Sequence, residues 1–181
     1  MIIKKIQLRR KVAFITGDAQ GIGKGFAGAL REFGTKIIIG DLNIKLAQKT
    51  SSEIKKRYSV DSMAIELDVR SSDSIKYTVN NTINSFGKID IAINNAGIAA
   101  NENAENISDI GWRNLLDVNL SGVFFYCREE AKSMIKNGGG IIANIASMSS
   151  IVVNHLKKQS YYNALKAGVV LRILKESYNV S

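Results

Sequence analysis

The sequence predicts an α/β fold in which a doubly wound parallel sheet is covered by helices on both faces. Two observations predict it. Short apolar runs alternate with longer amphipathic stretches along the chain, and the runs are continuously apolar, as expected for strands buried on both faces. Five β-then-α units in succession are typical of a parallel sheet with crossover helices.

Each element follows from its pattern. The apolar runs are expected to form strands at 12–16, 36–40, 62–67, 89–94 and 140–146. The segments between them carry apolar residues near i, i+3 and i+4, and helices are expected over 21–33, 43–58, 71–86, 108–136 and 160–177. No internal repeat, low-complexity tract or flexible linker divides the 181 residues, so we interpret 1–181 as one domain.

The chain is basic, with 25 Lys and Arg against 16 Asp and Glu and a formal charge of +9. Such a surface can attract the phosphates of a cofactor, a nucleic acid or a membrane. The excess is diffuse, however, and its densest runs have no interleaved aromatic residues on which bases could stack. We therefore expect no nucleic-acid partner.

The single cysteine, Cys127, excludes an internal disulfide and has no partner for a metal or redox motif. We expect no metal and a reducing, cytoplasmic setting. The amino end lacks an apolar segment of signal-peptide length, and no later run reaches the roughly 18 apolar residues of a membrane span. No membrane partner is expected.

The segment "TGDAQGIG" at 16–23 joins the first expected strand to the first expected helix. A loop that opens a helix directs backbone amides and the positive end of the helix dipole at an anion. Glycines here would serve a tight turn, an open approach for a pyrophosphate and close helix packing. The pattern T-G-x-x-x-G-x-G predicts a dinucleotide-binding loop, and the alternative is a loop that is only a tight turn. The residues expected to contact the dinucleotide are Gly17, Gln20, Gly21, Ile22 and Gly23.

Asp41 ends the second expected strand, 18 positions after Gly23. A carboxylate at this place can accept hydrogen bonds from the adenosine ribose hydroxyls of NAD and repel the 2′-phosphate of NADP. The cofactor is therefore expected to be NAD. The alternative is that Asp41 caps the helix that follows.

Tyr162 and Lys166 stand four positions apart, so a helix would place them on one face. The neighbouring Tyr161 has Leu165 at that offset and cannot make the same pair. An ammonium beside a tyrosine favours the phenolate. Tyr162 is thus a candidate general acid and base near neutral pH, with an ordinary exposed pair on a helix as the alternative.

Seven segments together resemble the short-chain dehydrogenase/reductase family. They are "TGDAQGIG" at 16–23, Asp41, "LDV" at 67–69, "NNAG" at 94–97, "VNLSGVF" at 118–124, "NIAS" at 144–147 and "YNALK" at 162–166. The resemblance covers nearly the whole chain. It implies a Rossmann-like sheet and an oxidoreductase that uses a nicotinamide cofactor.

The resemblance implies a catalytic set of four residues. Tyr162 would exchange a proton with the substrate oxygen, and Ser147 would hydrogen-bond the same oxygen. Lys166 would hold the nicotinamide ribose and favour the tyrosinate, and Asn119 would anchor a water that leads to Lys166. Ser147 is preferred to the nearby Ser149 and Ser150 because it directly follows "NIA".

The resemblance also extends the expected cofactor site. Asp68 and Val69 would contact the adenine, and Asn95, Ala96 and Gly97 would border the cofactor after the fourth strand. Tyr162 and Lys166 would contact it as well.

A narrower resemblance, carried by 144–154 and 162–169, is to members that oxidise sugar alcohols or reduce ketoses. It implies that the secondary alcohol or ketone is a sugar alcohol or ketose. The resemblance to the whole family implies hydride transfer with NAD(H) and a homo-oligomer, dimer or tetramer, formed through the helices at 108–136 and 160–177. Family members ordinarily continue beyond the helix of Lys166, so the chain is expected to lack the last strands of the fold. The alternative is an inactive relative that only binds a dinucleotide or associates with other subunits.

Overall fold

The computed structural model describes residues 8–152 and 158–177. Its centre is a five-stranded sheet in the order β3-β2-β1-β4-β5, and every neighbouring pair is parallel. The prediction of a doubly wound parallel sheet is confirmed. The strands are β1 (Val12–Thr16), β2 (Lys36–Asp41), β3 (Ser62–Glu66), β4 (Ile91–Asn94) and β5 (Ile141–Asn144).

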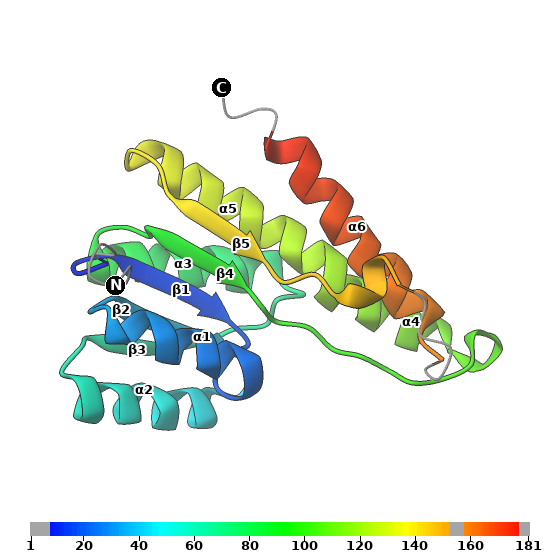
Figure 1. Cartoon of the computed structure of the whole chain (residues 1–181), viewed down its shortest axis with the longest axis horizontal. Helices are drawn as coiled ribbons and strands as arrows, with labels where there is room; N and C mark the ends of the chain where they lie inside the picture. The colour runs from blue at the N-terminus through cyan, green and yellow to red at the C-terminus, as the bar shows by residue number, and fades with distance from the viewer. Residues whose placement is uncertain (1–7, 153–157, 178–181) are drawn as a thin grey trace.

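Helices cover both faces of the sheet (Figure 1). The α-helices are α1 (Gly21–Glu32), α2 (Ile44–Tyr58), α3 (Ser72–Phe86), α4 (Asp109–Leu116), α5 (Gly122–Lys136) and α6 (Ser160–Ser177). Two short 3₁₀ helices, η2 (Ala104–Asn106) and η4 (Met148–Ser150), lie in the connections. Among the described residues, no helix combines the length and the apolarity that crossing a membrane requires.

Alternate residues of β1 face two separate cores. Phe14 belongs to the cluster with residues of α3 and α5, whereas Ile15 belongs to the cluster with Ala27 of α1 and Ile54 of α2. All five residues of β1 are buried. A strand with both faces covered must be apolar at every position, which explains the continuous run that the sequence shows.

The expected helix at 108–136 is divided. α4 and α5 are joined by η3 (Asp117–Ser121), a π-helical turn. Apolar periodicity averages over many residues and does not register one widened turn, so the sequence predicted one regular helix. Such turns often occur at functional sites, and this one contains Asn119.

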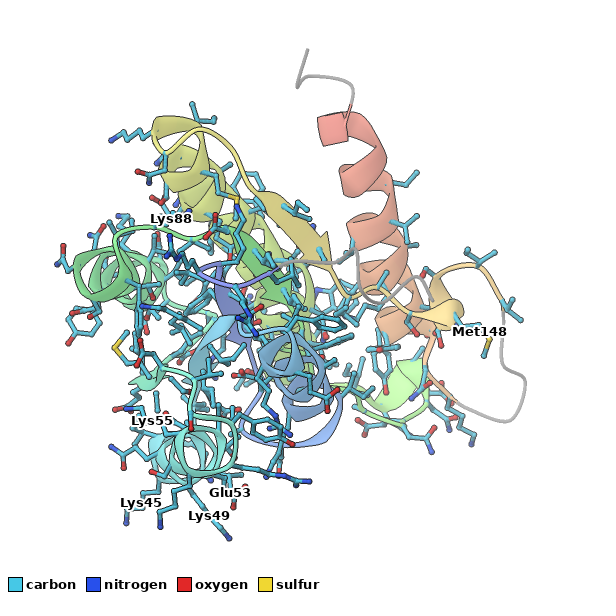
Figure 2. All side chains as sticks on the ribbon, turned by 60° about the vertical axis from the view of Figure 1, so that its left-hand side comes forward. Lys45, Lys49, Glu53, Lys55, Lys88 and Met148 are labelled. Carbon is cyan, nitrogen blue, oxygen red and sulfur yellow. The ribbon has the colours of Figure 1, made fainter. Side chains whose placement is uncertain are left out.

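The charged surface is mixed rather than concentrated. Figure 2 shows Lys45 and Lys49 projecting outward from α2 with Glu53 close by. Glu53 pairs with Lys24 of α1 at 2.9 Å. The interspersed acidic residue breaks up the positive surface of this helix.

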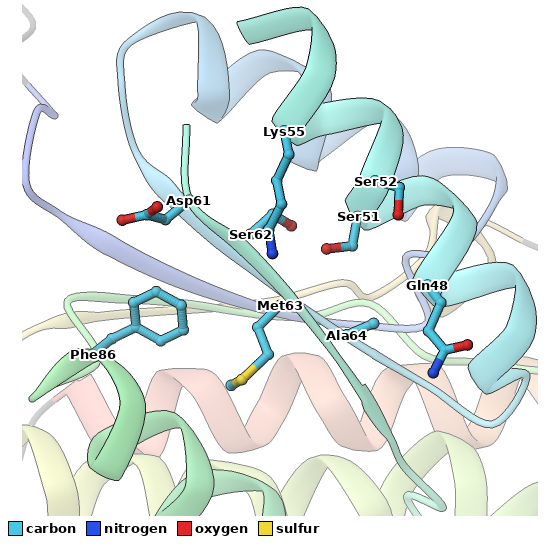
Figure 3. A pocket seen from close by; sticks show the side chains of 9 residues that line it. All are labelled: Gln48, Ser51, Ser52, Lys55, Asp61, Ser62, Met63, Ala64 and Phe86. Atoms are coloured by element: carbon cyan, nitrogen blue, oxygen red, sulfur yellow. The ribbon is translucent and has the colours of Figure 1, made fainter. Parts of the chain in front are cut away.

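The outer edge of the sheet at β3 has a shallow hollow of about 410 Å³. Figure 3 shows it between Lys55 and Ser51 of α2 on one side and Phe86 of α3 on the other, with Met63 of β3 between them. Its lining contains none of the predicted site residues. The hollow follows from β3 being an edge strand of the described sheet, next to which no further strand lies.

Candidate functional site

The predicted site residues meet at the carboxyl ends of the strands. β1 and β4 are neighbours in the sheet, but α1 and α5 pack in the cores of opposite faces, so a crevice opens between the loops. Open α/β sheets bind ligands at such a switch point. The cleft here has a volume of about 380 Å³, and its lining includes Gly17, Gln20, Asp41, Asp68, Asn95 and Gly97.

The glycine loop has the backbone that its composition predicts. Gly17 and Gly21 have φ angles of 65° and 59°, a region that favours glycine. A Cβ on Gly23 would lie 2.6 Å from the carbonyl oxygen of Gly17, so only glycine lets α1 pack this closely. A Cβ on Gly21 would meet nothing within 4 Å, so the backbone there is open to a ligand. Gln20 and Ile22 are exposed beside it.

Asn95 joins this loop to the loop after β4. Its side-chain Nδ2 donates to the carbonyl oxygens of Thr16 at 3.1 Å and Gly17 at 2.9 Å. The hydroxyl of Thr16 in turn accepts from the amides of Asn95 at 3.1 Å and Ala96 at 3.0 Å. The two loops therefore form one hydrogen-bonded unit. The sequence pattern did not indicate this role of Thr16, although Thr16 is the first residue of "TGDAQGIG".

Asp41 holds the ends of two loops with its carboxylate. Oδ2 accepts from the amide of Ala19 at 3.1 Å, and Oδ1 accepts from the amide of Asn43 at 2.9 Å. The alternative in which Asp41 caps α2 is wrong, because Asn43 is the N-cap and accepts from the amide of Leu46. Asp41 thus lies in the cleft beside the glycine loop, where an adenosine ribose is expected.

Asp68 forms a bidentate ion pair with Arg70. The guanidinium donates to Oδ2 at 2.7 Å and to Oδ1 at 2.9 Å, and a further nitrogen donates to the side chain of Asn114 in α4. The hydrogen bonds from Arg70 lower the pKa of Asp68. Asp68 and Val69 line the cleft as expected, and so do Arg70 and Asn114, which were not predicted. The 44-residue separation of Arg70 and Asn114 leaves no local pattern in the sequence.

Lys166 is buried, with 3% of its surface exposed. Its Nζ donates to the carbonyl oxygen of Ile145 at 2.7 Å and lies 5.9 Å from the ring centroid of Tyr162. Burial lowers the pKa of Lys166. Tyr162 is partly exposed, whereas the neighbouring Tyr161 is buried and accepts a hydrogen bond at its hydroxyl from the amide of Glu102. Of the two tyrosines, Tyr162 is the accessible one.

Asn119 is fully buried in the π-helical turn. Its Nδ2 donates to the carbonyl oxygens of Ile98 at 2.8 Å and Leu115 at 3.1 Å, and its Oδ1 accepts from the amide of Ile98. A Cβ on Gly97 would lie 3.0 Å from this Oδ1 and 3.6 Å from Nζ of Lys166. Asn119 and Lys166 therefore flank the same glycine at the border of the cleft.

Ser147 lies between β5 and η4. Its hydroxyl accepts from the amide of Ser149, and the hydroxyl of Ser150 donates to its carbonyl oxygen. The backbone of Ser149 and the side chain of Ser150, the two alternative serines, thus both hydrogen-bond to Ser147. Since η4 packs against α6, the helix that carries Tyr162 and Lys166, the candidate catalytic residues belong to adjoining elements.

The described residues fit a dinucleotide. The open backbone at Gly21 and the amides at the start of α1 suit a pyrophosphate, and the Asp41 carboxylate suits ribose hydroxyls. Next to Gly97 at the border of the cleft, Lys166 offers an ammonium near the ring of Tyr162. This combination of phosphate site, ribose acceptor and lysine–tyrosine pair fits a protein that binds a nicotinamide dinucleotide.

Comparison with known proteins specifies the family. A family model described as short chain dehydrogenase matches residues 11–174, so the chain belongs to the short-chain dehydrogenase family. It is 35% identical over 164 residues to cyclohexanol dehydrogenase of Acinetobacter sp. (strain SE19), which covers 90% of this chain and 64% of that relative. The chain thus spans a little under two thirds of this relative.

Two solved structures share the fold. NADPH-dependent 3-quinuclidinone reductase from Rhodotorula rubra has a TM-score of 0.90 and 28% identity, covering 99% of this chain and 68% of that chain. NAD⁺-bound xylitol dehydrogenase has a TM-score of 0.87 and 27% identity, covering 92% of this chain and 64% of that chain. The family binds nicotinamide dinucleotides, and these two relatives differ in which one they use.

Proposed function

We propose that this chain binds NAD(H) and catalyses hydride transfer involving a secondary alcohol or a ketone. The observation that carries the proposal is the position of Lys166, buried next to Tyr162 and beside Gly97 at the border of the cleft. A nicotinamide dinucleotide, when bound, supplies the carbon that accepts or donates the hydride.

The side chains divide the proton chemistry among them. In alcohol oxidation, the substrate O–H bond breaks and its proton passes to the oxygen of Tyr162 as the hydride leaves the substrate carbon. The Ser147 hydroxyl donates to the same substrate oxygen and holds it in place. The ammonium of Lys166, fixed by the carbonyl oxygen of Ile145, stabilises the tyrosinate that accepts the proton. In ketone reduction each step runs in reverse.

Asn119 helps to position the backbone around Lys166. Its side chain binds the backbone of Ile98 on one side and of Leu115 on the other. It therefore fixes the distance between the loop after β4 and the π-helical turn, and it keeps Gly97 close to Lys166. We propose that the water expected beside Lys166 is bound by the backbone that Asn119 holds in place.

NAD(H) is favoured over NADP(H) by Asp41. Its carboxylate lines the cleft at the end of β2, and a negative charge there repels a 2′-phosphate. The substrate class is supported by cyclohexanol dehydrogenase and xylitol dehydrogenase, whose names denote a secondary alcohol and a sugar alcohol. We propose a sugar alcohol or the corresponding ketose as the first compounds to test.

Titration of the chain with NADH and NADPH, followed by nicotinamide fluorescence, tests the cofactor. Saturable binding that favours NADH supports the proposal and justifies a screen of polyols and ketoses. Binding of NADH without turnover of any of them favours an inactive relative that retains only its dinucleotide site. Absence of binding by the folded chain contradicts both.

We also propose a homo-oligomer formed through α5 and α6. The support is apolar surface on and near these helices, where Leu171 of α6 is 69% exposed and Trp112 of α4 is 38% exposed. A Leu171→Asp variant should have a lower mass in light scattering than the unmodified chain. An equal mass would exclude this surface.

A further inference from the structure

Asp18 is a carboxyl group enclosed within the glycine loop. Its neighbours in sequence are both tied to the end of β2, because the amide of Gly17 donates to the carbonyl oxygen of Gly40 at 2.7 Å and the amide of Ala19 donates to Asp41. Asp18 itself is 0% exposed. Neither of its carboxyl oxygens has a hydrogen-bond partner among the residues that the structure describes.

Among the residues that the structure describes, none places a compensating positive charge against Asp18. From β2 it meets the negative charge of Asp41. α5 brings Tyr126, a second acid whose ionisation Asp18 opposes. From α2, the hydroxyl of Thr50 donates to the carbonyl oxygen of Ala19 at 2.9 Å. From α1, Gly23 lies against the backbone of Asp18.

Two effects make a negative charge on Asp18 unfavourable. An unpaired buried carboxylate is costly because it loses its hydration, and Asp41 repels it. Burial raises the pKa of Asp18 well above its ordinary value, with Asp41 acting in the same direction, while the nearby amides of Asp18 and Gly40 oppose the shift without cancelling it. Both effects favour the neutral form of Asp18.

The amides expected to hold a pyrophosphate belong to the same loop. A negative charge directly beneath them would oppose the field that attracts the phosphates, whereas a neutral carboxyl leaves that field intact. We propose that Asp18 is a positioning residue whose protonated carboxyl allows the glycine loop to hold a dinucleotide and whose ionisation weakens that hold. This inference rests on the proposed cofactor binding and adds that the binding depends on the protonation of Asp18.

The proposal has a thermodynamic consequence. If the dinucleotide binds better when Asp18 is protonated, linkage requires that binding raises the proton affinity of Asp18 by the same factor. Dinucleotide affinity should then fall as the pH rises through the ionisation of Asp18, by at most about tenfold per pH unit for one proton. Binding in that range should be accompanied by proton uptake.

ADP-ribose is the most informative probe, since it contains the pyrophosphate and adenosine but no nicotinamide. It keeps the second ribose, which Lys166 is expected to hold, so the contribution of Asp18 is isolated by comparison with a variant at position 18. Its dissociation constant is measured by calorimetry from pH 6 to pH 9 for the unmodified chain and for Asp18→Asn. We expect at least a threefold weakening over this range for the unmodified chain and a flat profile for the variant. Adenosine, which lacks phosphate, should show no pH dependence with either.

Two further measurements keep the proposal open to refutation. Calorimetry of the unmodified chain in buffers of different ionisation enthalpy should show proton uptake on binding, which needs no variant. NADH is titrated in parallel. If NADH and ADP-ribose fail to bind at every pH, the proposed function fails together with this inference. If both bind but no proton is taken up, or if Asp18→Asn keeps the pH profile, the role of Asp18 alone is refuted.

Discussion

Nδ2 of Asn95 lies 2.9 Å from the carbonyl oxygen of Gly17, and this hydrogen bond connects the loops after β4 and β1. A second bond from the same nitrogen reaches Thr16. The shape of the phosphate-binding loop thus depends on a residue almost 80 positions away.

Replacement of Asn95 by alanine should therefore affect stability and binding together. Loss of two bonds to partly buried carbonyls should lower the free energy of unfolding by about 2 kcal/mol, and NADH binding should weaken because the loop is no longer held. Urea unfolding and NADH titration measure the two effects. Asn81→Ala is the matched control, because the Asn81 bond to Tyr77 is exposed on α3. Unchanged NADH affinity in Asn95→Ala would contradict the coupling.

The two adjacent tyrosines should separate chemistry from structure. Tyr162→Phe should reduce turnover by at least about 100-fold while NADH binding stays nearly intact. Tyr161→Phe should retain turnover and lose about 1 kcal/mol of stability, because its hydroxyl binds the amide of Glu102. Steady-state kinetics and urea unfolding of both variants test this. Equal activity losses in the two variants would remove Tyr162 from its proposed role.

Asp41→Asn should narrow the preference for NADH. The substitution removes the charge that repels a 2′-phosphate and retains an oxygen able to accept a backbone hydrogen bond. The ratio of the NADPH and NADH dissociation constants should fall by about tenfold. Asp61→Asn removes an equally negative side chain, paired with Lys36 outside the cleft, and should leave the ratio unaltered. An unaltered ratio in Asp41→Asn would exclude Asp41 as the specificity residue.

Glu130 should make stability depend on pH. It is fully buried on α5, and burial raises its pKa to about 8, with the hydrogen bond from Asn94 acting in the opposite direction. The folded chain keeps this proton while the unfolded chain releases it above about pH 4.5. The contribution to stability is thus fully present below pH 4.5 and declines as the pH rises toward 8, by up to about 1.4 kcal/mol per pH unit.

Glu130→Gln should accordingly be increasingly more stable than the unmodified chain between pH 5 and pH 8, measured by urea unfolding. Glu129 provides the comparison on the same helix. Its pKa is lowered by its partners Lys132 and Arg128 despite partial burial, so Glu129→Gln should not gain stability over this range. A constant difference between Glu130→Gln and the unmodified chain would show that Glu130 is ionised in the fold.

The sequence contained most of the fold because its strands and helices differ in period. A strand such as β1 is apolar at every position except its last, Thr16, whereas a helix such as α1 buries only one face, and both patterns are local. The positive φ of Gly17 and Gly21 was also readable, since the motif needs glycine there. The roles of the candidate catalytic residues, the oligomeric state and the cytoplasmic location stay predictions.

The features that escaped prediction are those that depend on distant partners. Arg70 and Asn114 meet only because the loop after β3 lies next to α4 in the folded chain. The burial of Asp18 depends on α1 and β2, which enclose it only in the folded chain, so the sequence around Asp18 does not indicate it. The π-helical turn around Asn119 widens one turn of a longer helical pattern, and apolar periodicity does not register a change that short.

The side chain of Asn119 makes three hydrogen bonds, all with main-chain atoms of Ile98 and Leu115. Main-chain atoms are the same whatever side chain is attached. Position 98, where Ile98 is 38% exposed, can therefore vary in identity without losing its bonds to Asn119, whereas position 115 also packs in the core with Tyr161 and Leu165. Asn119 itself has no substitute that offers both a donor and an acceptor at that length. Substitutions in this region should be tolerated very unevenly, and the pattern of tolerance alone would reveal where the asparagine is indispensable.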